Sequence, residues 1–248
     1  MTAAPVVQPH TALVTGASKG IGAAIARELH AQGLTVVVHF NSDRSAAELI
    51  AAKLGDRVHL AGGDLSAAGG PQRVWDAAVA AVGRVDVLVN NAGAWLSSPV
   101  DDAEAWATGW QRNLALNLQA PADLSRLAIE HFAGRGGVIV NITSRSAHRG
   151  DDADHLAYGA AKGGLLALTR GIARGYAQQG VLAYAVSPAW VATELAAGEE
   201  LEKLAATLPL GEVTPPEEVA AVVGFLASGR ARHATGTTID VTGADYVR

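Results

Sequence analysis

The chain has 248 residues, of which 49% are hydrophobic and 17% are charged, and its formal net charge is −5. This length allows a substantial core and suits one large α/β domain better than two small ones. The composition excludes a disordered or fibrous protein. The absence of cysteine excludes disulfides, thiolate metal sites and a cysteine nucleophile. No excess of Lys and Arg is present for general binding to nucleic acid.

Residues 1–10 lack the basic start and the apolar run of a signal peptide, and no apolar stretch is long enough to span a bilayer. We therefore expect a cytoplasmic protein with no membrane or nucleic-acid partner. Residues 1–10 are expected to form a short tail, and residues 11–248 a single domain. The eight histidines show no H-E-x-x-H or similar spacing, so we expect no catalytic metal.

Short β-branched runs alternate with Ala-rich helical stretches, such as 21–32, 71–82 and 156–178. Several of the runs are continuous Val, Ile and Leu, which is typical of strands covered on both faces. The pattern predicts an α/β fold with a single doubly wound, Rossmann-type parallel sheet of about seven strands and helices on both faces. The expected strands are 12–15, 35–39, 58–61, 85–89, 138–142, 181–186 and 238–241.

The longest irregular segment runs from residue 188 to about residue 213, just before the last helix and strand. Two interpretations stay open, an ordinary surface excursion and a mobile lid. Within this segment we expect residues 189–212 to form a substrate loop.

A turn with three glycines, Gly16, Gly20 and Gly22, joins the first predicted strand directly to a helix. Its spacing, G-x-x-x-G-x-G, does not match the generic G-x-G-x-x-G fingerprint literally. Small residues let backbone N–H groups approach an anion, and a helix N-terminus adds positive potential. The turn therefore favours a nucleotide site over a tight turn that serves packing alone.

The second predicted strand should end near the adenosine ribose of a bound dinucleotide. An acidic residue there would accept from the 2′-hydroxyl and repel a 2′-phosphate. The chain instead has Asn41 and Ser42 at this place, while Lys19 and Arg44 supply positive charge. This pattern favours NADP(H), and Asp43 keeps NAD(H) possible.

Tyr158 and Lys162 lie four residues apart near the start of an Ala-rich helix, so their side chains share one helical face. An ammonium beside a phenol stabilises the phenolate and lowers its pKa. Ser144 follows the apolar run 138–142, and active groups in open α/β sheets collect at the carboxyl ends of strands. Because no G-x-S-x-G elbow surrounds Ser144, a hydrolase nucleophile is disfavoured. We predict Tyr158 as a proton donor.

Seven motifs in one consistent order resemble the single-domain branch of the short-chain dehydrogenase/reductase family. They are TGASKGIG at 15–22, GDL at 63–65, NNAG at 90–93, Asn117 in NLQAP, Ser144, YGAAK at 158–162 and SPAWVAT at 187–193. The resemblance covers nearly the whole chain. It implies an NAD(P)-dependent oxidoreductase with a small-molecule carbonyl or alcohol substrate, assembled as a homotetramer or homodimer.

The resemblance also implies a role for each matching residue. Tyr158 would be the general acid in reduction, Lys162 would lower the Tyr158 pKa and hold the nicotinamide ribose, Ser144 would orient the carbonyl, and Asn117 would fix a water in the proton relay. The predicted cofactor-binding residues are Gly16, Ser18, Lys19, Gly20, Ile21, Gly22, Asn41, Ser42, Arg44, Asp64, Leu65, Asn91, Ala92, Gly93, Tyr158, Lys162, Pro188, Val191 and Thr193.

The predicted substrate residues are Trp95, Ser146 and Trp190, and the two tryptophans favour a flat or apolar substrate. Trp190 follows Pro188-Ala189 at a place where the family usually has Pro-Gly. The neighbouring cations Arg145, His148 and Arg149 leave room for an acidic group on the substrate.

Three functions are compatible with these observations. The first is an NADP(H)-dependent reductase of ketones, and the second is an NAD-dependent alcohol or sugar dehydrogenase. The third, from another class, is a nucleotide-sensing protein that has lost catalysis, against which the intact set of Asn117, Ser144, Tyr158 and Lys162 argues.

Overall fold

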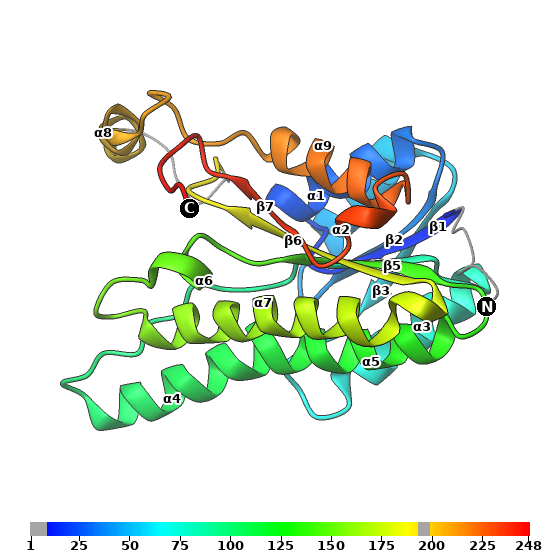
Figure 1. Cartoon of the computed structure of the whole chain (residues 1–248), viewed down its shortest axis with the longest axis horizontal. Coiled ribbons are helices and arrows are strands. Elements are labelled where there is room, and N and C mark those ends of the chain that lie inside the picture. The colour runs from blue at the N-terminus through cyan, green and yellow to red at the C-terminus, as the bar shows by residue number, and fades with distance from the viewer. Residues whose placement is uncertain (1–8, 193–198) are drawn as a thin grey trace.

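The computed structural model describes residues 9–192 and 199–248, and a seven-stranded sheet runs through it. The strand order is β3-β2-β1-β4-β5-β6-β7, and every pair is parallel. Helices cover both faces (Figure 1), which confirms the predicted fold class. The strands are β1 Thr11–Val14, β2 Thr35–Phe40, β3 Val58–Gly62, β4 Val87–Asn90, β5 Gly137–Ile142, β6 Val181–Pro188 and β7 Thr238–Val241.

The helices alternate with the strands as the sequence pattern predicts, and each of the three helical stretches named from the sequence overlaps a helix. The α-helices are α1 Gly20–Ala31, α2 Arg44–Leu54, α3 Gly70–Val82, α4 Ala103–Leu114, α5 Ala120–His131, α6 Ser146–Arg149, α7 Leu156–Tyr176, α8 Glu199–Thr207 and α9 Pro216–Ala227. A π-helical turn, Ala115–Gln119, joins α4 to α5, and short 3₁₀ turns follow at Ala177–Gln179 and Arg232–Ala234.

One part of the segment expected to be irregular is helical. Helix α8 lies inside residues 188–213, where its sequence EELEKLAAT is rich in residues with high helix propensity. The substrate loop predicted at 189–212 therefore contains a helix of nine residues.

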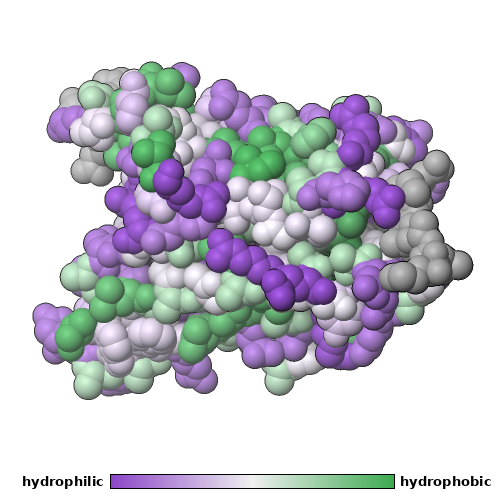
Figure 2. Space-filling view, in the orientation of Figure 1, coloured by the Kyte–Doolittle hydropathy of each residue, from purple (hydrophilic) through white to green (hydrophobic). Residues whose placement is uncertain are grey.

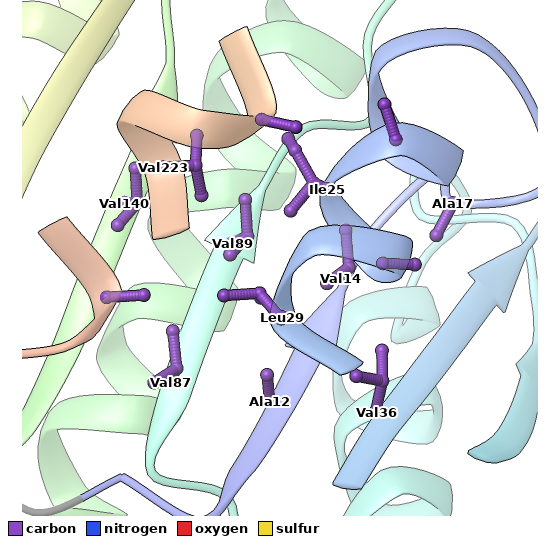
Figure 3. Close-up of a cluster of buried hydrophobic side chains, with 14 of the residues drawn as sticks. Ala12, Val14, Ala17, Ile25, Leu29, Val36, Val87, Val89, Val140 and Val223 are labelled. Carbon is purple, nitrogen blue, oxygen red and sulfur yellow. The ribbon is translucent and has the colours of Figure 1, made fainter. Parts of the chain in front are cut away.

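The strands are apolar on both faces because each face of the sheet has its own core. Val14, Val89 and Val140 point to one side, where α1 and α9 pack over them through Ile25 and Val223 (Figure 3). The alternate strand residues point to the other side and meet α3, α5 and α7; they include Leu13, Val37, Leu88 and Ile139. Successive side chains of a strand alternate between faces, so continuous Val, Ile and Leu runs fill both cores.

Apolar residues also reach the surface at scattered positions. Figure 2 shows a hydrophobic area over α9, where Phe225 is exposed, and hydrophilic residues around it. Single exposed apolar side chains of this kind are ordinary in soluble folds.

The chain order reverses next to β1, which has β2 on one side and β4 on the other. In open α/β sheets, ligands bind in the crevice outside the carboxyl ends of the strands at such a reversal. Figure 1 shows α6 and the start of α7 at the end of the molecule toward which β6 points. The fold thus brings residues from several strand ends together at one edge.

A buried carboxylate ties β1 to the turn that enters β4. Asp86 accepts hydrogen bonds from the backbone N–H groups of His10 (2.9 Å) and Thr11 (3.1 Å) and is paired with Arg84. Burial by itself would raise the pKa of Asp86, but these hydrogen bonds and the Arg84 charge outweigh burial and hold the pKa below its usual value.

We expect Asp86→Asn to lower the free energy of unfolding by about 1–3 kcal/mol near neutral pH, because buried donors lose a charged acceptor. A depressed native pKa stabilises the fold above the unfolded-state value of about 4, and this contribution is lost as the pH falls through the native pKa. Urea unfolding at a series of pH values should therefore show the difference narrowing below about pH 4. A difference that stays constant with pH would contradict this role of Asp86.

Candidate active site

At two glycines of the turn after β1, the packing leaves no room for a side chain. Gly16 has φ +61°, and a Cβ there would lie 3.0 Å from Ala92 Cα. A Cβ at Gly22 would lie 2.2 Å from Gly16 O and 2.5 Å from Asn91 Nδ2. The turn therefore presents bare backbone at the start of α1.

Helix α1 begins with no side chain capping its N-terminus, and its N-cap residue is the exposed Lys19. The first N–H groups of a helix lack intrahelical acceptors, and they carry the positive end of the helix dipole. An uncapped start behind a glycine turn suits the phosphates of a dinucleotide.

Asn91 and Thr15 fasten this turn to the end of β4. Asn91 Nδ2 donates to the carbonyl oxygens of Thr15 (2.8 Å) and Gly16 (3.1 Å). The Thr15 hydroxyl accepts from the backbone N–H groups of Asn91 and Ala92, both at 2.9 Å. The two predicted motifs, at 15–22 and 90–93, thus form one rigid unit.

His39, at the end of β2, adds a connection that the sequence analysis missed. Its Nδ1 accepts from Gly16 N–H (3.0 Å), so the other ring nitrogen, Nε2, carries the proton and donates to Gly63 O (2.9 Å). Burial lowers the pKa of His39. The neutral ring links the glycine turn to the loop after β3, and no motif spacing signals a histidine in this role.

A cleft of about 910 Å³ opens outside the ends of β1, β2, β3 and β4. Most of the predicted cofactor residues line it, namely Gly16, Ser18, Lys19, Gly20, Ile21, Gly22, Asn41, Ser42, Asp64, Leu65, Asn91, Ala92 and Gly93. Residues that were not predicted also line it, among them His39, Asp43, Ser66, Gln111 and Arg112. Gln111 and Arg112 come from α4, where the sequence carries no motif.

Six predicted cofactor residues do not line the cleft or cannot be placed. Two of them, Tyr158 and Lys162, belong to the catalytic set described below. Arg44 points away, its guanidinium lying 5.3 Å from the centre of the Phe40 ring and 3.5 Å from a Glu48 carboxylate oxygen. Pro188 ends β6, and Val191 forms a bridge with Thr214; neither lines the cleft. Thr193 falls outside the described residues.

The side chains of Ser144 and Tyr158, both predicted as catalytic, lie close together beyond the end of β5. The Ser144 side chain faces the Tyr158 hydroxyl closely enough to counteract part of the rise in the Tyr158 pKa. Ser144 Oγ also accepts from Ser146 N–H (3.1 Å) and donates to Ser146 Oγ (3.2 Å). Ser146, predicted as a substrate residue, is buried and orients Ser144.

Lys162 and Asn117 lie on the cleft side of this pair. Lys162 Nζ donates to Ile142 O (2.9 Å) and lies 5.7 Å from the centre of the Tyr158 ring. Asn117 is fully buried on the π-helical turn, and its Oδ1 accepts from Ala94 N–H (3.2 Å). Turns of this type occur often at functional sites. In the predicted catalytic set, Ser144 therefore lies against Tyr158, and Lys162 lies over the Tyr158 ring. Asn117 and Lys162 are both next to Gly93.

Gly93 is the contact point between the catalytic set and the cleft. A Cβ built at Gly93 would lie 2.7 Å from Asn117 Oδ1 and 3.2 Å from Lys162 Nζ. Gly93 also lines the cleft, so a ligand in the cleft reaches both side chains only because this position has no side chain.

Burial is the largest influence on the pKa of both Tyr158 and Lys162. It raises the pKa of Tyr158 to about 12; the Ser144 side chain opposes this shift and the Asp151 charge adds to it. Burial lowers the pKa of Lys162 to about 8. The expected lowering of the Tyr158 pKa by Lys162 is therefore not seen here, because Nζ lies over the ring and is bonded to Ile142 O.

Two tryptophans predicted as substrate residues pack against each other and against neighbours of the catalytic set in sequence. Trp95 stacks on His155, with ring centres 3.6 Å apart, and meets Trp190 edge to face. The Arg145 guanidinium lies 5.2 Å from the centre of the Trp190 ring and is paired with Asp245. Burial and the Arg149 charge lower the pKa of Arg145 to about 10, so it stays charged at neutral pH.

The fold, the cleft and the hydroxyl pair together define an oxidoreductase that uses a nicotinamide dinucleotide, and comparison with known proteins agrees. A family model described as enoyl-(acyl carrier protein) reductase matches residues 16–243. The 3beta-hydroxysteroid dehydrogenase 1 of Eggerthella lenta is 38% identical, over 94% of this chain and 92% of its own. The chain belongs to the short-chain dehydrogenase/reductase family.

Two solved structures of similar proteins contain a nicotinamide cofactor, NADPH in one and NADH in the other. A blue fluorescent protein from a metagenomic library, in complex with NADPH, has a TM-score of 0.89 and 32% identity, covering 98% of this chain and 100% of its own. A 3-ketoacyl-(acyl-carrier-protein) reductase from Brucella melitensis, complexed with NADH, has a TM-score of 0.85 and 26% identity, covering 97% and 99%.

Among residues 9–192 and 199–248, no helix is both long and apolar enough to cross a membrane. In the same residues, no cluster of three or more His, Asp or Glu side chains is arranged to hold a metal ion.

We expect Gly93→Ala to lower turnover by roughly tenfold to a hundredfold, because its methyl group displaces Asn117 or Lys162 by a fraction of an ångström. Steady-state kinetics measures the loss, and circular dichroism checks the fold. Gly171→Ala is a matched control, since a Cβ at Gly171 meets nothing within 4 Å. Unchanged turnover in Gly93→Ala would contradict the close contact described here.

Proposed function

We propose that the protein is an NADP(H)-dependent carbonyl reductase that acts on ketones, with Tyr158 as the proton donor. The observation that carries this proposal is the placement of the Ser144 side chain against the Tyr158 hydroxyl, beyond the carboxyl end of β5. Lys162 and the floor of the cleft lie beside it. The name of the hydroxysteroid dehydrogenase relative supports a secondary alcohol and ketone pair as the reacting group.

The residues present fit a dinucleotide. The uncapped start of α1 suits the phosphates, and Asp64 and Leu65 line the cleft where the adenine would lie. The bare floor at Asn91–Gly93 lets a flat ring approach Lys162. When bound, the nicotinamide supplies the hydride, and the protein contributes binding, orientation and the proton.

The chain's own groups would act on the carbonyl oxygen of the substrate. The Ser144 hydroxyl, oriented by Ser146, donates a hydrogen bond to this oxygen, and Tyr158 delivers its phenolic proton to it. A pKa of about 12 keeps the Tyr158 hydroxyl protonated and able to donate near neutral pH. The positive charge of Lys162 would stabilise the phenolate that remains after proton transfer. Asn117 would hold a water molecule that helps return a proton to Tyr158.

The groups around the cleft support NADP(H) over NAD(H). Lys19, Asn41 and Ser42 line it and can bind a 2′-phosphate, whereas Arg44 is turned toward Phe40 and Glu48. Asp43 also lines the cleft, and this observation favours the second candidate, an NAD-dependent alcohol or sugar dehydrogenase. Asp43 Oδ1, however, caps α2 by accepting from Ala46 N–H (3.0 Å), which directs part of its charge to that helix.

We expect Tyr158→Phe to reduce ketone turnover by about 10²-fold or more, because the phenolic proton is removed. Tryptophan-fluorescence titration should show cofactor binding largely retained. Ser144→Ala should cost less, because it removes orientation and leaves the proton. Activity retained in Tyr158→Phe would defeat the mechanism, and cofactor binding without any carbonyl turnover in the unaltered protein would favour a nucleotide sensor.

The cofactor preference is tested on Lys19. We expect the unaltered protein to bind NADPH more tightly than NADH, and Lys19→Ala to weaken NADPH binding by about tenfold while changing NADH binding less, since a charged contact to the phosphate is lost. Lys53→Ala, on α2 and outside the cleft, removes the same charge and serves as the control. Tighter binding of NADH would overturn the assignment of NADP(H).

A further inference from the structure

Two half-open indole rings form a perpendicular apolar corner. The ring centres of Trp95 and Trp190 lie 5.8 Å apart with an angle of 87° between the planes. Trp95 is 47% exposed and Trp190 is 38% exposed. Aromatic side chains usually bury most of their area, so two that stay open and hold each other edge to face are suited to covering a ligand.

Each indole is tied to the chain segment that carries one of the reactive hydroxyls. Trp95 stacks on His155, whose carbonyl oxygen accepts from Gly159 N–H (3.2 Å) in the first turn of α7, beside Tyr158. Trp190 lies over the guanidinium of Arg145, the residue after Ser144. The corner and the proton donor are therefore held in a fixed relation.

The Trp190 side of the corner is held by both backbone and side-chain contacts. Trp190 O accepts from Thr214 N–H (2.9 Å), and Arg145 N–H donates to Pro188 O (3.0 Å). The Arg145 side chain is paired with Asp245 from the C-terminal segment. The wall is thus fixed before a substrate binds, and little ordering entropy is lost on binding.

The charges around the corner are largely balanced within the protein. Arg145, the buried residue that follows Ser144, already has Asp245 as its partner. His155 Nδ1 lies 2.6 Å from Asp152 Oδ1. His148 lies 3.2 Å from the Ser187 hydroxyl and 3.8 Å from an Asp240 carboxylate oxygen, and it stacks on Tyr246. Arg149 is an exposed cation of this region. A substrate carboxylate at Arg145 would meet the negative charge of Asp245.

From these observations we infer that the substrate is an uncharged, rigid alicyclic ketone or the matching secondary alcohol, whose ring system lies against Trp95 and Trp190. Two walls at right angles are both contacted by a rigid ring skeleton, whereas a short flexible chain leaves one of them open. Arg145 and Asp245 are positioning residues that hold Trp190 and keep the corner neutral. This inference rests on the proposed carbonyl reductase function.

The shape of the corner is tested with decalone, a rigid bicyclic ketone, and butanone, a small acyclic one. We expect kcat/KM of the unaltered protein to favour decalone by about tenfold or more. Trp190→Ala and Trp95→Ala should each lower this ratio by about tenfold, and Trp190→Phe should lower it less. Tyr176→Ala is the control, because Tyr176 is 37% exposed but lies at the opposite end of α7. The inference would be overturned if the tryptophan substitutions lowered kcat/KM equally for both ketones, or if the unaltered protein preferred butanone.

The neutrality of the corner is tested with a cyclohexanone that carries, opposite its carbonyl, either a carboxylate or the ethyl ester. We expect the ester to have the higher kcat/KM. Asp245→Asn should raise the carboxylate-to-ester ratio by about tenfold, because Arg145 then lacks its partner. Asp240→Asn should leave the ratio unchanged, since Asp240 has the same 19% side-chain exposure but pairs with Arg248.

A higher kcat/KM for the carboxylate than for the ester in the unaltered protein would overturn the inference. If Arg149→Ala then abolished that preference, Arg149 would be identified as the cation that binds the carboxylate. The proposed function fails in a different way, through no turnover of any ketone with either cofactor. Butanone turnover without selectivity for ring size or charge would leave the reductase function standing and remove only the inference about its substrate.

Discussion

The site depends on the hydrogen bonds that join the end of β1 to the end of β4 through Thr15 and Asn91. The sheet order reverses between these strands, so the crevice at their carboxyl ends is where a dinucleotide can lie. These bonds fix the glycine turn on one side of the crevice and Gly93 on the other. Gly93 in turn touches Asn117 and Lys162, so the cofactor cleft and the catalytic set form one continuous structure.

Burial shifts the pKa values of Tyr158 and Lys162 in opposite directions. It raises the pKa of Tyr158 to about 12, which favours a protonated phenol, and lowers the pKa of Lys162 to about 8. A protonated phenol is the form needed to reduce a carbonyl. Oxidation of an alcohol needs the phenolate, which becomes accessible only when positive charge is brought near Tyr158. Burial therefore favours the form of Tyr158 that carbonyl reduction uses.

The sequence predicted most of the fold because strands buried on both faces read as unbroken apolar runs, and all seven were located from them. It also placed the glycine turn, Ser144 and Tyr158, because local spacing reports their positions. The Arg44–Glu48 pair has the i,i+4 spacing of one helix and could have been read from the sequence, but the sequence could not show that His39 bridges Gly16 and Gly63 or that Asp245 neutralises Arg145. Those contacts join residues from separate elements, and no short-range pattern encodes them.

The role of Tyr158 is tested most directly by replacing its phenol with a more acidic one. A fluorinated tyrosine at position 158 keeps the ring and its place against Ser144 but has a lower phenolic pKa. Because reduction needs the protonated phenol, the alkaline limb of the pH profile of kcat/KM for ketone reduction should move to lower pH, following the change in phenol pKa. A pH profile unchanged by fluorination would contradict the assignment of Tyr158 as the proton donor.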